Sequence, residues 1–347
     1  MIKIVYITKK GELIGEKIKK VFNYYKYDCS LESSKEFKPL GTEKGFIFIM
    51  ATGITLRKYI LGELNEFIKD KTQDPFVIAV DEMGNNIIPL LSSHLGQGMY
   101  FSELLGTELQ INVSKTTASD VNNKLGIDVL SEKYFLETPC KKDILKINKA
   151  VLEYKPKLSI PLSWKNSETD KLKDSYELTY HNLDEECSNV ENWVFEDNII
   201  LKAKPVCFGV GARKGIAPYK VYWAIKKACY LRNIPIWRIN SFSTVEVKKN
   251  EKGILKTVSK FKKPLNIYSV DELNYIYNTY SDLFDLEHSE FVYKTIGTYG
   301  VSEPCAILDV INHLDLNDAE KDLIHLIDLI LPKLRNNGTT VSICSKI

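Results

Sequence analysis

The chain has 347 residues, of which 44% are hydrophobic and 27% are charged. These fractions are typical of globular proteins and argue against disordered, collagen-like and disulfide-stapled chains. The length exceeds that of one average domain, so we expect more than one packed unit. Because 47 Lys and Arg nearly balance 45 Asp and Glu, the net charge of +2 indicates no particular partner.

The sequence indicates neither a membrane span nor an export signal. Its longest apolar run covers only residues 46–51, far short of the roughly 18 residues that a spanning helix needs. The apolar stretch within residues 1–10 is too short for a signal peptide. The seven cysteines show no CxxC spacing, so we interpret them as reduced core thiols and expect a soluble, cytoplasmic protein without a membrane partner.

Strand and helix patterns alternate at the start of the chain, as in an α/β domain. Together with a hairpin turn around Gly84, they predict a first domain over residues 1–130. The predicted elements, in chain order, are strand 2–7, helix 12–25, strand 45–50, a turn at 52–53, helix 54–67, strand 76–80, strand 87–91, helix 97–109 and strand 110–113.

A middle region over residues 131–204 follows this domain. The chain has no glycine between Gly126 and Gly209, which excludes a flexible Gly/Ser linker. Short alternating patches predict a small β-containing connector, and its most polar stretch, residues 166–175, is expected to be exposed. The patches cover residues 176–180, 193–195 and 199–201.

The α/β pattern returns in residues 205–347, which are predicted to form a C-terminal domain. The fold class is therefore α/β, with two α/β domains joined by a small β-containing middle region. The predicted elements of the last domain are strand 206–210, a glycine-rich turn, helix 218–231, strand 234–239, helix 253–261, strand 265–268, helix 270–280, helix 301–308 and strand 340–344.

Charge is distributed unevenly within this last domain. Residues 200–263 hold 16 basic and 2 acidic residues, whereas residues 264–330 hold 2 basic and 13 acidic ones. One interpretation is that the two halves neutralise each other across a folded domain. The other is that the basic half faces a polyanionic ligand or a nucleic acid.

The segment Gly209-Val210-Gly211-Ala212-Arg213-Lys214-Gly215 lies between a predicted strand and a predicted helix. Glycines at such a turn let backbone amides approach an anion, and the following helix N-terminus adds partial positive charge. Its spacing differs from the GxGxxG pattern of dinucleotide sites, and no acidic residue ends the next predicted strand, which argues against a nicotinamide cofactor. Arg213 and Lys214 suit carboxylates instead.

Asp81 and Glu82 follow one predicted strand, and Ser92 and His94 follow its hairpin partner. Polar side chains at the carboxyl ends of strands commonly line the ligand crevice of an open α/β sheet. A histidine beside carboxylates can act as a general acid or base. Taken alone, His94 is equally compatible with a hydrogen-bonded structural role.

A second glycine-punctuated turn, residues 293–303, contains Lys294 and Thr295 and leads to Glu303 at a predicted helix start. Glu303 can act in chemistry, or it can simply complement the helix dipole. The chain has no GxSxG elbow, HExxH motif, P-loop or EF-hand loop, which argues against a serine hydrolase or a zinc peptidase, and no protein metal site is visible.

Taken together, these segments resemble the cobalt-precorrin-5A hydrolases, the CbiG family of the anaerobic vitamin B12 pathway. The order and spacing of the motifs across two domains carry the resemblance, which covers most of the chain. The matching segments are 51–54 with Arg57, 74–82, 90–92, 94–96, 116–120, 209–215, 271–273, 294–295, 300–301 and Glu303.

The chain departs from the family pattern at three places. Ser93 and residues 97–99 interrupt the family's usual loop around His94. Ala212 stands where a cysteine is common, which argues against a thiol nucleophile at that turn. Thr298 and Tyr299 replace smaller residues in the last turn.

The resemblance implies hydrolysis of the δ-lactone of a cobalt corrinoid, which releases acetaldehyde and gives cobalt-precorrin-5B. It implies no resident cofactor, because cobalt arrives within the substrate. The carboxylates on the rim of that substrate explain the basic segment without nucleic acid, and RNA-binding patterns are absent. Other enzymes of the cobalamin pathway are further candidate partners. The alternative is a non-catalytic corrinoid-binding or carrier protein of the same fold.

Roles for individual residues are hypotheses from chemistry. We expect His94 or Glu303 to act as base, with Asp81 and Glu82 beside it as further catalytic candidates. Arg213 and Lys214 are expected to clamp carboxylates, and the turns at residues 52–53 and 211 are expected to donate backbone amides. The complete set of predicted substrate-binding residues is Thr52, Gly53, Arg57, Ser92, Gly209, Gly211, Arg213, Lys214, Lys294 and Thr295.

Overall fold

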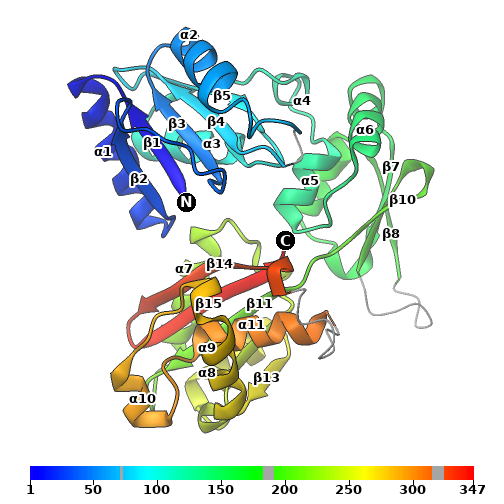
Figure 1. Ribbon diagram of the computed structural model, residues 1–347. Helices are drawn as coiled ribbons and strands as arrows, with labels where there is room; N and C mark the ends of the chain where they lie inside the picture. The colour runs from blue at the N-terminus through cyan, green and yellow to red at the C-terminus, as the bar shows by residue number, and fades with distance from the viewer. Residues whose placement is uncertain (71–72, 183–190, 315–323) are drawn as a thin grey trace. The chain divides into compact units, whose positions relative to one another are not determined.

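The computed structural model describes residues 1–70, 73–182, 191–314 and 324–347 (Figure 1). The chain divides into two compact units, Met1–Ala203 and Lys204–Ile347. It is a mixed α/β protein with three sheets, which confirms the predicted fold class. The sheet of the middle region belongs to the first unit, and the predicted boundary at residue 130 stays a prediction. No helix among the described residues combines the length and the apolar character needed to cross a membrane.

A six-stranded sheet forms the centre of the first unit, in the order β2-β1-β3-β4-β5-β6. The first four strands in that order are parallel, β5 runs antiparallel to β4, and β6 runs parallel to β5. The strands are β1 (Ile2–Tyr6), β2 (Cys29–Ser33), β3 (Gly45–Ile49), β4 (Phe76–Val80), β5 (Asn86–Leu91) and β6 (Asn112–Val113).

Helical segments cover both faces of this sheet. On one face α1 (Lys9–Tyr24) and α3 (Gly98–Leu109) pack against a core that includes Ile47 and Ile78. On the other face, Phe48 and its neighbours pack against the segment that follows β3. Because β3 and β4 are apolar on both faces, their sequences are continuous hydrophobic runs.

The predicted helix 54–67 differs in detail. It begins as the short α2 (Thr52–Ile54) and continues as a π-helical segment, Thr55–Glu63. The N–H of Leu64 donates to the carbonyl of Tyr59 five residues earlier, at 2.7 Å, which is the π-helical pattern.

The middle region contains more regular structure than its sequence indicated. Its predicted β patches are confirmed as strands in a sheet of order β10-β9-β7-β8, whereas β7 and the helices were missed. The elements from residue 118 to residue 202, of which α4 and the start of α5 precede the middle region, are α4 (Ala118–Val121), α5 (Ile127–Tyr134), α6 (Lys141–Glu153), β7 (Lys157–Pro161), β8 (Glu177–His181), β9 (Asn192–Phe195) and β10 (Ile199–Lys202). The expectation that residues 166–175 are exposed is wrong for Thr169, Leu172 and Ser175, which are buried.

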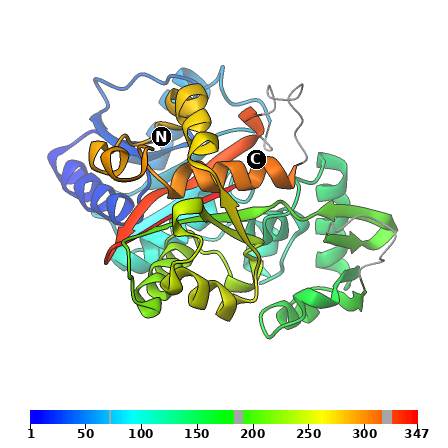
Figure 2. The same ribbon diagram turned by 90° about the horizontal axis from the view of Figure 1, so that it is seen from below.

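The second unit has a five-stranded sheet of order β13-β12-β11-β15-β14. β11, β12 and β13 are parallel, β15 is antiparallel to β11, and β14 forms a hairpin with β15 (Figure 2). The strands are β11 (Val206–Ala212), β12 (Ser241–Val245), β13 (Leu265–Tyr268), β14 (Ile327–Asn336) and β15 (Thr339–Lys346).

Helices again lie on both faces of the sheet. Phe208 of β11 faces the aromatic cluster of α7 and α8, whereas Cys207 belongs to the core formed with α9 and α11. The helices of this unit are α7 (Pro218–Leu231), α8 (Lys252–Phe261), α9 (Val270–Phe284), α10 (Glu290–Ile296) and α11 (Ser302–His313).

The predicted strand 234–239 is wrong. Residues Ile236–Arg238 form a 3₁₀ turn after Pro235, and the strand is Ser241–Val245. Its sequence is polar and therefore did not indicate a buried strand. Ser241, Ser243 and Thr244 are nevertheless completely buried, because each hydroxyl donates a hydrogen bond inside the protein.

The cysteines only partly match their expected place in the core. The thiols of Cys207, Cys229, Cys305 and Cys344 are free and buried. Cys29 is half-buried and Cys140 is exposed, so the core prediction is wrong for Cys140. Cys187 lies outside the described residues.

Candidate functional site

Several predicted residues lie at the carboxyl edge of β1, β3 and β4. Thr8 caps α1 by accepting a bond from the N–H of Gly11, and its hydroxyl donates to Oε1 of Glu82 at 2.6 Å. Thr52 and Gly53 begin α2, and the guanidinium of Arg57 lies directly beside Gly53. Parallel pairing of the three strands places these groups along one edge of the sheet.

Asp81 lies at the same edge, but its carboxylate stabilises a turn. It accepts bonds from the backbone N–H groups of Met83, Asn85 and Asn86 in the hairpin between β4 and β5. Burial alone would raise the pKa of Asp81, but these N–H groups outweigh it and hold the pKa below its ordinary value. The geometry argues against the predicted catalytic role, because the lone pairs are already engaged.

His94 and Asp81 do not share one crevice, contrary to the expectation from the sequence. Because β5 runs antiparallel to β4, Val80 pairs with Ile87 while Val77 pairs with Leu91. The turn after β5 therefore returns to the opposite edge, where Gly96 packs against the carbonyl of Asp74. At about 3.3 Å per residue, the two ends of β4 are roughly 13 Å apart.

The turn that carries His94 has an unusual backbone. Ser92 and Gln97 adopt φ values of 51° and 67°, the left-handed region that L side chains disfavour. Gly96 is required here, since a Cβ would lie 2.5 Å from Cβ of Ser92. Strained backbone of this kind is concentrated at functional sites.

Asp120 of α4 lies beside His94. Nε2 of His94 lies 3.8 Å from Oδ2 of Asp120, and each side chain is only 13% exposed. The hydroxyl of Thr117 donates to the same carboxylate. The Nε2 atom is buried beside this carboxylate and has no hydrogen-bond partner among the described residues. A histidine next to a carboxylate is the minimum unit for general-base chemistry.

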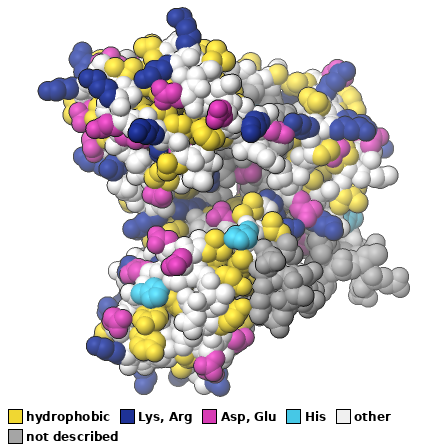
Figure 3. Space-filling view, in the orientation of Figure 1, with side chains coloured by type: hydrophobic (Ala, Val, Ile, Leu, Met, Phe, Trp, Pro, Cys, Tyr) yellow, Lys and Arg dark blue, Asp and Glu magenta, His cyan; other side chains and the backbone are white. Residues whose placement is uncertain are grey.

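No sequence motif indicated that His94 and Asp120 are in contact. Asp120 was part of a matching segment, but its distance of 26 positions from His94 hid the contact. Figure 3 shows Lys and Arg side chains interspersed with Asp and Glu on the visible face of the first unit.

In the second unit, the glycine-rich loop was predicted to begin too early in the chain. Gly209 and Gly211 lie inside β11, which pairs with β15 on one side and with β12 on the other. Gly209 allows close packing, because a Cβ would lie 1.8 Å from the carbonyl oxygen of Ser302 in α11. A Cβ on Gly211 would lie 2.5 Å from Oγ1 of Thr340. Packing explains these glycines, so their predicted role as anion-binding amide donors is not supported.

Arg213 and Lys214 leave the end of β11 and are exposed. The N–H of Arg213 donates to Gly338 in the β14–β15 turn. Within the described part of the chain neither side chain has a hydrogen bond or an ion pair, so both are available to a ligand. Glu251 accepts a bond from the N–H of Gly215 and is an acidic neighbour in the same turn.

Glu303 lies in the first turn of α11 and is only 2% exposed. Its Oε1 accepts the backbone N–H of Lys333, and its Oε2 lies 3.7 Å from Nζ of that lysine. Nζ also lies 3.9 Å from Glu287, yet Nζ of Lys333 and Oε2 of Glu303 have no hydrogen-bond partner among the described residues. Burial raises the pKa of Glu303 against the opposing effect of Lys333. The sequence did not indicate Lys333.

Lys294 and Thr295 were expected in a turn, but they lie in α10. Both are exposed, and the hydroxyl of Thr295 donates to the carbonyl of Phe291. The true turn covers residues 297–301, so a shared binding role for Lys294 and Thr295 has no support in the geometry.

The far end of α11 carries a polar cluster that was not predicted from the sequence. Both carboxylate oxygens of the completely buried Asp309 are engaged: Oδ2 accepts from Ser241, while Oδ1 accepts from Asn266 and Tyr268. Burial beside Asp309 raises the pKa of Tyr268 far above its usual value. No motif could indicate this cluster, because its members come from β12, β13 and α11.

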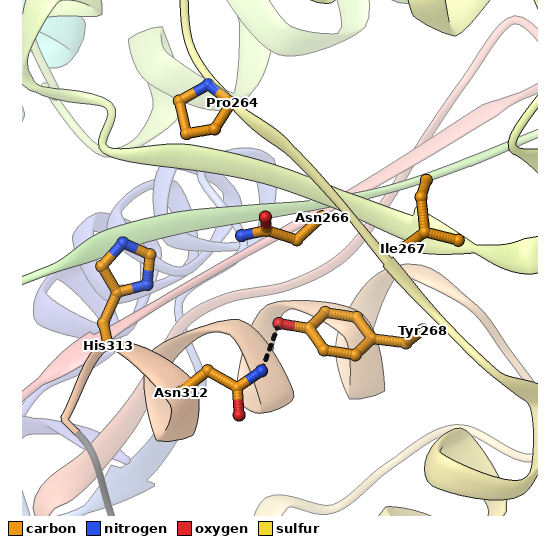
Figure 4. Close-up of a pocket in the computed structure, with 6 residues that line it drawn as sticks. All are labelled: Pro264, Asn266, Ile267, Tyr268, Asn312 and His313. Carbon is orange, nitrogen blue, oxygen red and sulfur yellow. Dashed lines mark hydrogen bonds between the residues drawn. The ribbon is translucent and has the colours of Figure 1, made fainter.

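An open hollow of about 510 Å³ lies beside this cluster (Figure 4). Its lining residues are Pro264, Asn266, Ile267, Tyr268, Asn312 and His313. The amide nitrogen of Asn312 donates to the hydroxyl of Tyr268 at 3.0 Å, as the dashed line in Figure 4 shows.

Cys207, Asp309 and His313 also bring three potential metal-ligand atoms within 4.8 Å of one another. Burial raises the pKa of the Cys207 thiol well above its ordinary value, and both oxygens of Asp309 accept hydrogen bonds. Nδ1 of His313 already contacts the carbonyl of Asp309. These three groups therefore do not fit a resident metal ion.

Comparison with known proteins shows the family of the chain. Models of the N-terminal and C-terminal regions of cobalamin synthesis protein G match residues 38–120 and 206–344. A probable cobalt-precorrin-5A hydrolase of Methanocaldococcus jannaschii is 50% identical over 346 residues, which cover 100% of this chain and 99% of the relative. The chain belongs to the cobalt-precorrin-5A hydrolase family.

Other members of the cobalt-precorrin-5A hydrolase family are more distant. The cobalt-precorrin-5A hydrolase of Priestia megaterium is 24% identical over 340 residues, with 88% of each chain covered. The crystal structure of a putative cobalamin biosynthesis protein G homologue from Sulfolobus solfataricus shares 19% identity and a TM-score of 0.53, covering 100% of this chain and 97% of that one. This last similarity concerns the fold alone. The resemblance inferred from the sequence motifs is confirmed, and the relatives' names support a hydrolase role in cobalamin biosynthesis.

Proposed function

We propose that this protein hydrolyses cobalt-precorrin-5A, opening its δ-lactone and releasing acetaldehyde to give cobalt-precorrin-5B. The observation that carries the proposal is the 50% identity, over the whole chain, to a relative named probable cobalt-precorrin-5A hydrolase. Cobalt enters as part of the substrate, and the proposal assigns no resident cofactor to the protein.

In the first step, His94 acts as general base toward a water molecule. Its imidazole ring takes a proton as the water oxygen attacks the lactone carbonyl, and Asp120, whose Oδ2 lies 3.8 Å from the buried Nε2, stabilises the imidazolium that forms. Collapse of the tetrahedral intermediate breaks the ring C–O bond. The products of this step are a carboxylate and a secondary alcohol that is still attached to the macrocycle.

In the second step, a base removes the proton of that alcohol. Its oxygen forms a C=O double bond, the adjacent carbon–carbon bond breaks, and the electron pair of that bond passes to the macrocycle, which later takes up a proton. The two-carbon fragment leaves as acetaldehyde. His94 can serve again here once it has lost its first proton.

Carboxylates on the substrate rim require cationic partners. Arg213 fits this role because its exposed guanidinium can form two parallel hydrogen bonds to one carboxylate, and Lys214 adds a second charge at the same turn. In the first unit, Arg57 offers a further exposed guanidinium beside Gly53.

The test is anaerobic incubation of the purified full chain with cobalt-precorrin-5A, with acetaldehyde and the ring-opened corrinoid measured over time. We expect both products to appear in equal amounts. Binding of the substrate without acetaldehyde, under conditions in which the Priestia megaterium relative turns over, would instead identify a corrinoid carrier.

A further inference from the structure

His313 ends α11 at the hollow, with a fixed tautomer. Its Nδ1 lies 2.8 Å from the carbonyl oxygen of Asp309. A carbonyl can only accept a hydrogen bond, so Nδ1 carries the hydrogen and Nε2 of the neutral ring keeps its lone pair. Among the described residues Nε2 has no partner, and the side chain is exposed at the hollow.

The other polar groups of the hollow are also electron-pair donors. The amide nitrogen of Asn266 is engaged by Asp309, and that of Asn312 is engaged by the Tyr268 hydroxyl, which leaves their carbonyl oxygens for a ligand. Among the described residues, no Lys or Arg lines the hollow. Such a surface disfavours the carboxylates of a corrinoid and favours a Lewis acid.

The remaining wall of the hollow is apolar and suits a flat ring. Pro264 lies on the same side of the view as His313, and Ile267 lies across from it (Figure 4). Because the hollow is open, one face of a macrocycle can lie over it while the charged rim stays in solvent. The only Lewis acid that a cobalt corrinoid presents from its face is the cobalt ion.

We propose that Nε2 of His313 binds the cobalt of the corrinoid substrate as an axial ligand. This inference rests on the proposed function, since the cobalt belongs to the substrate. Histidines that bind metals almost always donate their other ring N–H to a carboxylate, a backbone carbonyl or water, and the bond from Nδ1 to Asp309 is of this kind. The bond orients the imidazole ring and leaves the lone pair of Nε2 for the cobalt.

The experiment uses cob(II)inamide, a cobalt corrinoid that has no lactone and no nitrogenous base of its own. Electron paramagnetic resonance of this probe bound to the full chain should show each high-field cobalt line split into three by one ¹⁴N nucleus. His313→Ala should abolish the splitting and weaken binding by about tenfold or more, because metal affinity falls by at least that much when even an outer partner of a ligand is lost. His288→Ala, which changes another exposed histidine of the same unit, should keep the splitting.

Splitting that persists in His313→Ala, or that is absent from wild-type protein with the probe bound, overturns the proposal. Failure of the wild-type protein to bind cob(II)inamide up to the solubility of the probe overturns it as well. Thermal unfolding of each variant shows whether the fold is intact. Acetaldehyde release from cobalt-precorrin-5A, measured on the same preparations, tests the hydrolase function separately, because the probe has no lactone to open.

Discussion

His94 lies in a strained turn, and its Nε2 has no hydrogen-bond partner among the described residues. A single substitution distinguishes a general base from a structural histidine. If it is the general base, His94→Gln should lower kcat by roughly 10²–10⁴ with little change in thermal stability. Single-turnover release of acetaldehyde, together with thermal unfolding, measures both quantities.

A matched control is His181→Gln in the same unit, whose ring contacts the hydroxyl of Ser159 away from the His94 turn. This variant should turn over normally. If His94→Gln instead loses about 1–3 kcal/mol of stability while each folded molecule keeps normal turnover, His94 is a structural residue.

Glu303 should make stability depend on pH. Burial raises its pKa in the folded protein above the value of about 4.3 that the unfolded chain has, so the folded state holds this proton more tightly. The contribution of Glu303 to the free energy of unfolding is therefore greatest below the unfolded pKa and is lost as pH rises through the folded pKa.

Glu303→Gln removes the titrating carboxyl group. As pH rises through that window, the free energy of unfolding of the wild type should therefore fall relative to that of the variant. Urea denaturation at a series of pH values measures it. Parallel profiles for the two proteins would show that the pKa of Glu303 is the same in the folded and unfolded chains.

At the scale of elements, the contact between β11 and α11 depends on one missing side chain. Gly209→Ala would place a methyl group 1.8 Å from a backbone oxygen of α11, so strand and helix must move apart, at a cost of about 3 kcal/mol or more. Gly215→Ala is the matched control: its φ is +72°, but nothing lies within 4 Å, so only the roughly 1–2 kcal/mol of left-handed backbone strain applies. Chemical denaturation of both variants measures the difference, and equal losses would contradict this assignment.

Elements with a clear hydrophobic pattern were predictable from the sequence. The apolar run of β4 and the helix α7, which begins at Pro218, have the predicted bounds. The predictions failed where polar residues are buried, as in β12, and where a strand has mixed burial, as in β14. In these strands the choice of residues depends on hydrogen bonds and neighbours in the folded protein, and hydrophobic periodicity does not predict such contacts.

The site was predictable only in part, for a related reason. Motifs indicated His94, Arg213 and Glu303 because each lies beside glycines at the end of an element. Lys333 and His313 have no such neighbours, and their importance comes from elements that meet only in the folded unit. The predicted proximity of Asp81 and His94 was wrong because antiparallel strands end at opposite edges of the sheet.

At the scale of the whole molecule, the uneven charge of the second unit predicts how the substrate binds. Arg213→Ala should weaken binding by roughly tenfold to hundredfold, and Arg213→Lys should recover only part of this, because a point charge cannot form the paired hydrogen bonds. Since Arg213 is exposed, the loss should shrink at high salt. Titration of the substrate at two salt concentrations measures it. Lys260→Ala, an exposed lysine of α8, is the control, and an equal loss there would indicate a general charge effect.

The reversed direction of β5 also determines which substitutions are energetically coupled. Asp81 and His94 lie at opposite edges of one sheet and share no partner among the described residues. In a double-mutant cycle, the free energies of unfolding lost by Asp81→Ala and His94→Gln should therefore add to within about 0.5 kcal/mol. A coupling energy well beyond that would mean that the central strands transmit strain along their length, so that the turn around His94 responds to changes at the far end of the sheet.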